Sequence, residues 1–248
     1  MSDEGSNRPP VVDELPRLSA DEQFQFACHP DVPCFNACCR DLDLLLGPYD
    51  VLRLRRRLGL SSRQLFARLV DSLELPGTGF PAVALRMSDA PGRPCPFVES
   101  TGCSVYSDRP AACRIYPLGR GAGIDEQGRP VERWCVVREP HCRGFEQGRR
   151  WTSASWVEDQ GIAGYLAVDD RYQRLVARVS ARGLRLTAPQ QRQFGVALYQ
   201  LDRFGEILAT SDLLDRWAVP ERDRAAIAAD EGRRLALALH HIERELLG

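Results

Sequence analysis

Nine cysteines are the residues of this sequence whose type and spacing suggest chemistry. A thiolate is a soft, anionic donor, so clustered cysteines select zinc, copper(I) or iron–sulfur centres over magnesium or calcium. The candidate metal ligands are Cys28, Cys34, Cys38, Cys39, Cys95, Cys103, Cys113, Cys135 and Cys142. Nine thiols would fill two four-ligand sites and leave one over.

The spacing of the cysteines excludes the commonest metal-binding motifs. Successive cysteines are separated by 6, 4, 1, 56, 8, 10, 22 and 7 positions, so no C-x-x-C occurs. Zinc ribbons, RING-like sites and the common ferredoxin runs use such pairs, and their absence tilts the choice of metal slightly toward iron. The ligands must converge from three distant segments. Cys38 and Cys39 are neighbours, and adjacent side chains in extended backbone point to opposite sides, so they suit two centres better than one.

Two other interpretations of the cysteines remain open, inert buried thiols and a disulfide framework. The odd number of cysteines disfavours disulfides, and so does the first segment, MSDEGSNRPP, which is acidic and has no apolar stretch typical of an export signal. No run reaches the ~20 apolar residues that span a bilayer. We therefore expect a cytoplasmic protein with no membrane partner. His29 and His141 each adjoin a cysteine. Three roles stay open for each imidazole: a metal ligand, a hydrogen-bond donor to a ligand, or a solvent-facing side chain.

The composition narrows the function further. The chain has 248 residues, of which 44% are hydrophobic and 27% charged, as in a globular protein of one or two domains. All 33 basic residues are arginine, which removes every lysine-dependent catalyst. The net charge is −1, and no basic block is interleaved with aromatic residues, so no nucleic-acid partner is expected. No nucleophile elbow, dinucleotide-binding glycine motif or paired-histidine metalloprotease motif occurs, so the residues assign no catalytic group and leave open whether the protein is an enzyme.

The elements that must position the cysteines are read from periodicity and turn residues. Residues 1–20 are polar and proline-bearing and are predicted to be poorly ordered. Residues 21–150 are predicted to form an irregular cysteine-cluster domain, and residues 151–248 a helical region packed against it. The fold prediction is therefore mainly α with little β. Leu235, Leu239, Ile242 and Leu246 follow one face of the last predicted helix.

Helix starts are predicted at four places. Pro48 suits a first helical turn, with Gly59 ending that helix. Capping boxes are predicted for Ser61 with Gln64, for Ser155 with Glu158, and for Thr187 with Gln190. The helix after Ser61 is predicted to run through Leu73. FPAVALRM is predicted to be a strand, and the glycine-rich GRGAGIDEQGRP a loop.

The order of motifs also resembles a known family. The segment F-x-C…C-x3-C-C-R, then CPF…GC-x-x-Y-x-x-RP-x-x-CR-x-YP and a later C…C-x-G, is similar to the YkgJ-type cysteine-cluster proteins, described as zinc- or iron-chelating. The resemblance covers about residues 24–148 and implies metal binding by all nine cysteines. The family's first cluster resembles F-x-C-x-x-C-G-x-C-C, whereas here HPDVP widens the first gap and Phe35 replaces the glycine. A more distant resemblance is to the cysteine-cluster part of a flagellin lysine methylase.

Three functions follow from these patterns. The favoured one is a metal-binding protein that chelates zinc or an iron centre, including an iron–sulfur centre, for a structural or carrier role, with closed thiolate coordination. The second is a metal-dependent protein-modifying enzyme, which requires an open coordination position or a neighbouring pocket. The third is an interaction module that recruits a protein partner through an uncovered apolar stripe from Leu235 to Leu246. Arg109 and Arg114 flank Cys113. Two roles stay open for these arginines: hydrogen-bond donation to sulfur, or ion pairing with Asp108 or Glu99.

Overall fold

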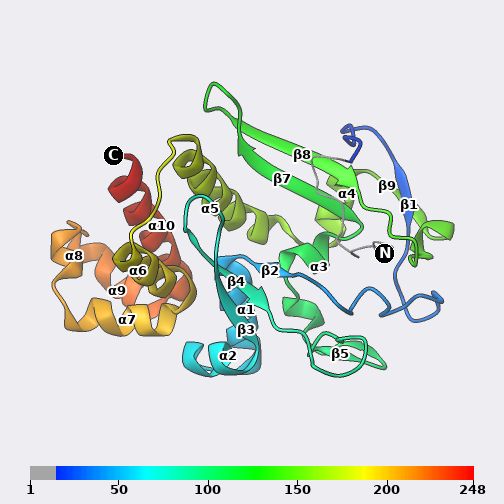
Figure 1. Ribbon diagram of the computed structural model, residues 1–248, viewed down its shortest axis with the longest axis horizontal. Coiled ribbons are helices and arrows are strands. Elements are labelled where there is room, and N and C mark those ends of the chain that lie inside the picture. Colours follow the sequence, from blue (N-terminus) through cyan, green and yellow to red (C-terminus); the bar gives the residue numbers. More distant parts are fainter. Residues whose placement is uncertain (1–14) are drawn as a thin grey trace, which may run out of the picture.

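Helix caps and short antiparallel pairings divide the chain into many small elements. The computed structural model describes residues 15–248, and Figure 1 shows their arrangement. The helices are α1 (Pro48–Leu58), α2 (Ser62–Arg68), α3 (Ala111–Ile115), α4 (Ser153–Asp159), α5 (Ala163–Ala181), α6 (Ala188–Tyr199), α7 (Leu201–Thr210), α8 (Leu213–Arg216), α9 (Glu221–Ala229) and α10 (Glu231–Leu247), with 3-10 turns η2 (Tyr106–Asp108) and η3 (Gly144–Glu146). The strands are β1 (Phe24–Phe26), β2 (Leu45–Leu46), β3 (Val70–Glu74), β4 (Pro81–Leu85), β5 (Val98–Glu99), β6 (Gly102–Cys103), β7 (Leu118–Ile124), β8 (Pro130–Val136) and β9 (Arg149–Trp151).

Most helix boundaries lie where the local chemistry predicts them. Pro48 opens α1, and Gly59 ends it with a left-handed φ of 63°. The Ser61 hydroxyl accepts a hydrogen bond from the Gln64 amide at the start of α2, and Thr187 does the same for Gln190 at the start of α6. The predicted Ser155–Glu158 box is wrong, because α4 is capped one turn earlier by Thr152, which accepts from the Ser155 amide.

The prediction of a mainly α fold with little β is wrong. Within the described residues, 46% are helical and 16% lie in strands, so the fold is mixed α/β. Val70–Glu74, predicted to continue a helix, is β3 and pairs with β4; the glycine-rich segment predicted as a loop belongs to the β7–β8 hairpin. In both places the hydrogen bonds of a neighbouring strand override local preference, because strand formation depends on its partner more than on its own sequence.

A large hydrophobic core joins the middle of the chain to its C-terminal helices. α1 and the antiparallel sheet β2-β4-β3 pack with α5, α6, α7, α9 and α10, around buried side chains such as Phe80 and Phe194. This core therefore draws on both sides of the predicted boundary at residue 150, and that boundary stays a prediction. Leu235, Leu239 and Ile242 on α10 are each 1% exposed. The apolar stripe of the third hypothesis is therefore covered by the chain's own helices.

A second, smaller core lies at the end of the molecule that carries the first cysteines. Phe24 and Phe26 of β1 pair with β9 and pack on Trp151 and Trp156. The Trp151 indole N–H donates to the Phe26 carbonyl at 2.9 Å, which ties the two strands together. Leu18 is buried in the same core, and residues 1–14 of the predicted N-terminal lead-in lie outside the described residues.

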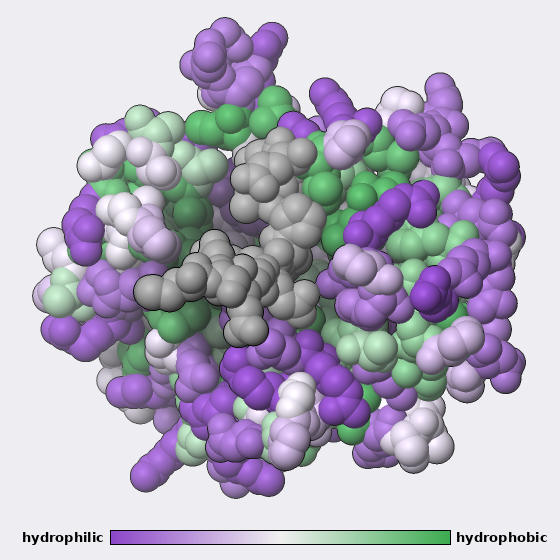
Figure 2. All heavy atoms as spheres, turned by 45° about the vertical axis from the view of Figure 1, so that its right-hand side comes forward, coloured by the Kyte–Doolittle hydropathy of each residue, from purple (hydrophilic) through white to green (hydrophobic). Residues whose placement is uncertain are grey.

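The described helices include none that is long and apolar enough to cross a membrane. Figure 2 brings forward the face that carries β1 and β9. Hydrophobic residues on this face form patches that hydrophilic residues interrupt.

Candidate metal centre

The cysteines lie on turns and short elements beside both cores: Cys142 packs against the smaller core, and Cys95 and Cys103 pack against the larger one. Four of them, Cys28, Cys34, Cys38 and Cys39, lie in the turns between β1 and β2. The next three are Cys95 before β5, Cys103 on β6 and Cys113 on α3. The last two are Cys135 on β8 and Cys142 in the turn before η3. Prolines 30 and 33 keep the first segment out of regular structure, which leaves its side chains free to converge.

Backbone hydrogen bonds hold the first cysteine segment against the second. Arg40 forms a bridge with Pro94, and the Cys95 amide donates to the Cys39 carbonyl at 2.9 Å. The Asn36 side chain donates to the Glu99 carbonyl at 3.0 Å, and Asn36 itself has a left-handed φ of 67°. Residues more than fifty positions apart are thereby fixed side by side.

The first thiol group consists of Cys28, Cys34 and Cys142. The Arg143 amide donates to the Cys34 sulfur at 3.0 Å, and the Cys34 and Cys142 side chains are hydrogen-bonded. Burial raises the pKa of Cys28 to about 11, and the negative charge that Cys38, Cys34 and Cys142 would carry raises it further. Burial also raises the pKa of Cys142. These thiols are therefore close enough to oppose one another's ionisation.

The second thiol group consists of Cys95, Cys103 and Cys113. The β5–β6 hairpin places Cys103 opposite Val98, three residues after Cys95. Burial raises the pKa of Cys95, and the charge of Cys103 adds to that shift. Cys113 is open to solvent on α3, yet the protein packed around it raises its pKa to about 12, with Cys95, Asp50, Cys103 and Cys38 as further causes.

Cys38 and Cys39 lie between the two groups. The hydrogen bond that the Cys38 thiol donates to its neighbour Cys39 is the largest cause that raises the pKa of Cys38, followed by burial. The negative charge that Cys38 would carry raises the pKa of Cys28 in the first group and the pKa of Cys113 in the second. Cys38 thus links the two groups, whereas the service of Cys38 and Cys39 to two different centres stays a prediction.

One buried cation lies among the thiols. Arg109 is 8% exposed, stacks on the Tyr106 ring at 3.7 Å and donates to the Tyr106 carbonyl at 3.0 Å. Burial lowers its pKa, and the thiols of Cys113 and Cys103 oppose that shift. Its positive charge in turn favours ionisation of Cys28 and Cys103. Arg109 therefore compensates part of the negative charge that a set of thiolates would concentrate here.

Arg114 has a structural role. Its guanidinium donates to the Gln160 carbonyl at 2.8 Å and to the Ser107 carbonyl at 2.7 Å. Asp108 pairs with Arg53 at 2.5 Å. Neither predicted flanking arginine forms an ion pair with Asp108 or Glu99 among the described contacts.

The remaining sequence-predicted residues are Cys135, His29 and His141. Cys135 is buried on β8, its sulfur 3.6 Å from the Gly119 carbonyl oxygen. His29 lies 3.5 Å from Asp31 and His141 lies 3.6 Å from Glu139, and both imidazoles are substantially exposed. Whether any of these three binds metal stays a prediction.

Two acidic residues near the thiols were missed at the level of sequence. Glu139 contributes to the raised pKa of Cys38 and hydrogen-bonds Tyr116, whose pKa is raised first by burial. Asp50 accepts a hydrogen bond from the Ala111 amide at 2.8 Å, and so holds the start of α3, which carries Cys113. The signal for Asp50 was its place in the first turn of α1, where a carboxylate accepts backbone N–H groups.

The donor set fits a thiophilic metal. As the side chains stand, no group of three or more His, Cys, Asp and Glu residues within 15–248 is arranged to hold an ion, so the fit rests on the chemistry of the donors. Their pKa values are raised by burial and mutual repulsion, which a bound cation relieves because metal binding deprotonates its thiol ligands. Zinc and iron are the ions that such sulfur donors favour over magnesium or calcium.

Gly144 permits the close approach that brings Cys142 to Cys34. A Cβ there would lie 2.5 Å from the Ala27 carbonyl oxygen and 2.6 Å from the Phe26 ring. We expect Gly144→Ala to lower the free energy of unfolding by about 2–4 kcal/mol and to separate the two thiols. Chemical denaturation measures the first effect, and the rate at which a bifunctional thiol reagent cross-links Cys34 to Cys142 measures the second. Gly123→Ala on β7, whose Cβ would meet nothing within 4 Å, is the control; equal losses in both variants would contradict the prediction.

Together these features describe a thiol-rich domain whose cysteines converge from separate segments without C-x-x-C pairs. Residues 27–143 match the model of the CxxCxxCC family, "Putative zinc- or iron-chelating domain". The predicted cysteine-cluster resemblance is thereby confirmed over a segment that contains all nine cysteines. No curated protein and no solved structure matches the chain.

Proposed function

We propose that residues 27–143 bind zinc or iron at two neighbouring thiolate centres, one built on Cys28, Cys34 and Cys142 and the other on Cys95, Cys103 and Cys113. Cys38 and Cys39 supply one further thiolate to each. The observation that carries this proposal is that eight cysteines from separate segments lie near enough for each to influence the pKa of another, although as the side chains stand no three donors within residues 15–248 are arranged to hold an ion. The zinc- or iron-chelating description of the matching family supports it.

The surroundings of the thiols favour a structural or carrier role. The loops between β1 and β2 contribute few residues to either core, so bound metal replaces apolar contacts that these loops lack. Cys28 and Cys113 are open to solvent, which gives an incoming ion access to each group. Arg109 balances charge between the groups without contributing a ligand.

Metal analysis of protein purified without air tests the proposal. We expect bound zinc or iron by elemental analysis, and sulfur neighbours at about 2.3 Å in the X-ray absorption spectrum. Iron would add visible absorption from sulfur-to-metal charge transfer, whereas zinc would leave the protein colourless. A folded, metal-free protein that takes up neither ion on addition would overturn the proposal, and so would metal held by oxygen donors alone.

A further inference from the structure

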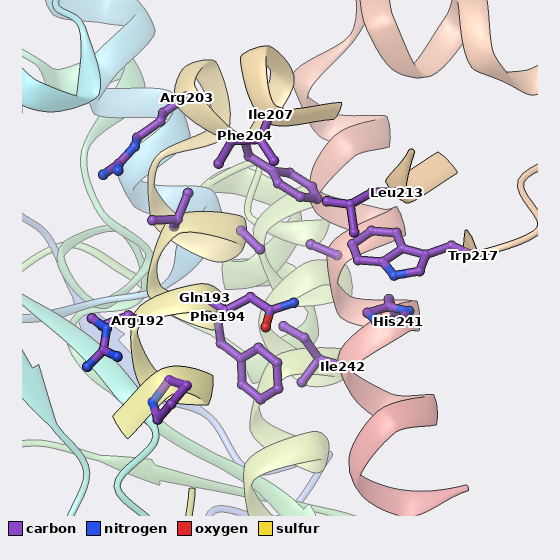
Figure 3. A pocket seen from close by; sticks show the side chains of 14 residues that line it. Arg192, Gln193, Phe194, Arg203, Phe204, Ile207, Leu213, Trp217, His241 and Ile242 are labelled. Atoms are coloured by element: carbon purple, nitrogen blue, oxygen red, sulfur yellow. The ribbon is translucent and has the colours of Figure 1, made fainter. Parts of the chain in front are cut away.

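Two open cavities lie between the C-terminal helices, and both are lined by Trp217. The first lies between α6, α7, α8 and α10, has a volume of about 400 Å³ and is lined by Phe194, Phe204 and Ile207 (Figure 3). The second lies between α9 and α10, also has a volume of about 400 Å³, and includes Ile227 among its apolar residues. Trp217 lines both. We call the two cavities with Trp217 the Trp217 surface.

Trp217 is held in one position. Its indole stacks on the His241 ring, with ring centroids 3.7 Å apart and planes within 20° of parallel. It also contacts Phe204 at 6.0 Å between centroids. The backbone after it turns sharply, since Ala218 has a left-handed φ of 52° and its amide donates to the Asp215 carbonyl. A fixed, half-buried tryptophan binds a partner without the entropic cost of ordering a mobile ring.

The rims of both cavities carry positive charge. Arg192 and Arg203 lie at the edge of the first cavity opposite Trp217 and His241, as Figure 3 shows, and Arg233 and Arg244 line the second. All four are exposed, and among the described residues none has a carboxylate within 4 Å. The two linings contain a single acidic residue, Asp223. Apolar floors are thus bordered by arginines that form no ion pair within 4 Å among the described residues, although the charge of Arg233 lowers the pKa of Asp230.

We propose that the Trp217 surface binds an acidic amphipathic helix of a partner protein. Apolar side chains spaced i, i+3, i+4 and i+7 on such a helix fill a groove of this kind, and its glutamates or aspartates meet the four arginines. Tryptophan and arginine are the residues that most often dominate binding energy at protein interfaces. Two cavities on either side of one indole favour a helix over a small anion, which would fill only one of them.

The test uses a fluorescent peptide of about 18 residues held helical by a side-chain staple, with leucines on one face and glutamates elsewhere. Fluorescence anisotropy with the full chain is expected to show saturable binding that weakens as salt is added. A peptide of the same composition with leucine and glutamate positions scrambled is expected to bind at least about 10-fold more weakly. Equal binding of the two peptides would overturn the proposal.

Charge-reversal variants locate the binding. Arg192→Glu/Arg203→Glu is expected to weaken peptide binding by about 10-fold or more, since it reverses one rim. The control is Arg178→Glu/Arg185→Glu, which changes two exposed arginines outside both linings and is expected to leave binding unchanged. Equal losses in both variants would overturn the proposal. So would sedimentation analysis showing that the surface is occupied by a second copy of the chain, or competition in which dodecanoate binds and the peptide does not.

Discussion

Cys38→Ser is expected to release metal from both thiol groups, whereas Cys34→Ser and Cys113→Ser are each expected to release it from one. Cys38 lies near enough to Cys28 and to Cys113 for its charge to raise the pKa of both, and it adjoins Cys39, so its replacement disturbs both groups. Removal of one ligand from a four-thiolate site typically costs most of its affinity, because the binding free energy depends on the complete set. Metal content per chain should therefore fall to about half in each of the two single-group variants and further in the Cys38 variant.

The control for Cys38→Ser is Ala37→Ser, an exposed neighbour in the same turn that introduces the same hydroxyl without removing sulfur. Far-ultraviolet circular dichroism follows the helices, which we expect to persist because the larger core that holds α5, α6, α7, α9 and α10 is built mainly from aliphatic and aromatic side chains, with only Cys95 and Cys103 packed against it. The prediction fails if Cys38→Ser keeps the metal content of the unsubstituted protein. It also fails if Cys34→Ser and Cys113→Ser each release all of the metal, which would indicate one centre instead of two.

Asp169→Asn is expected to remove much of the pH dependence of stability between about pH 5 and pH 8. Asp169 on α5 is 8% exposed, and one of its carboxyl oxygens is buried with no hydrogen-bond partner among the described residues. Asp50, 2% exposed, lies nearby and accepts from the Gly47 and Ala111 amides. Burial raises the pKa of Asp169 to about 7, with the charge of Asp50 as the next cause, and burial raises that of Asp50 to about 6.

The sign of the change in stability with pH follows from the raised pKa of Asp169. Below about pH 4 the Asp169 carboxyl is neutral in both the folded and the unfolded chain. As the pH rises, the unfolded chain loses its proton first while the folded chain retains it, so the free energy of unfolding falls until the pH passes about 7. An asparagine carries no charge at any of these values. At pH 8 we expect Asp169→Asn to be more stable than the unsubstituted protein, by on the order of 1–3 kcal/mol.

Urea unfolding at several pH values, with equal metal loading of both proteins, measures this difference. Asp170→Asn is the matched control, because Asp170 is the next residue of α5 but pairs with Arg120 at 2.6 Å. That variant is expected to lose an ion pair and to keep the pH slope. If the free energy of unfolding of Asp169→Asn changes with pH as steeply as that of the unsubstituted protein, the raised pKa of Asp169 is not the source of the pH dependence.

Local chemistry predicted three of the four helix starts and the strand β4 correctly, and failed for β3 and for the β7–β8 hairpin. The caps at Ser61 and Thr187, and the glycine that ends α1, depend on atoms within a few residues, so the sequence carries all the information needed. β3 depends on β4, and the glycine-rich part of β7 depends on β8. The spacing of apolar residues alone predicts a helix from Val70 to Leu73. That prediction was wrong because the partner strand satisfies the backbone there.

For the candidate site, residue type and clustering were sufficient to favour zinc or iron chelation, since clustered thiolates select such ions, and the description of the family that matches residues 27–143 agrees; which cysteines bind stays a prediction. The arrangement of those thiols into two groups around Cys38 and Cys39 was decided by long-range contacts such as the Arg40–Pro94 bridge and the Ala27–Gly144 hydrogen bond. The same is true of Asp169 facing Asp50, and of Trp217 stacking on His241. Short-range hydrogen bonding and donor chemistry are properties of the sequence, whereas which loops and side chains meet depends on how the whole chain packs.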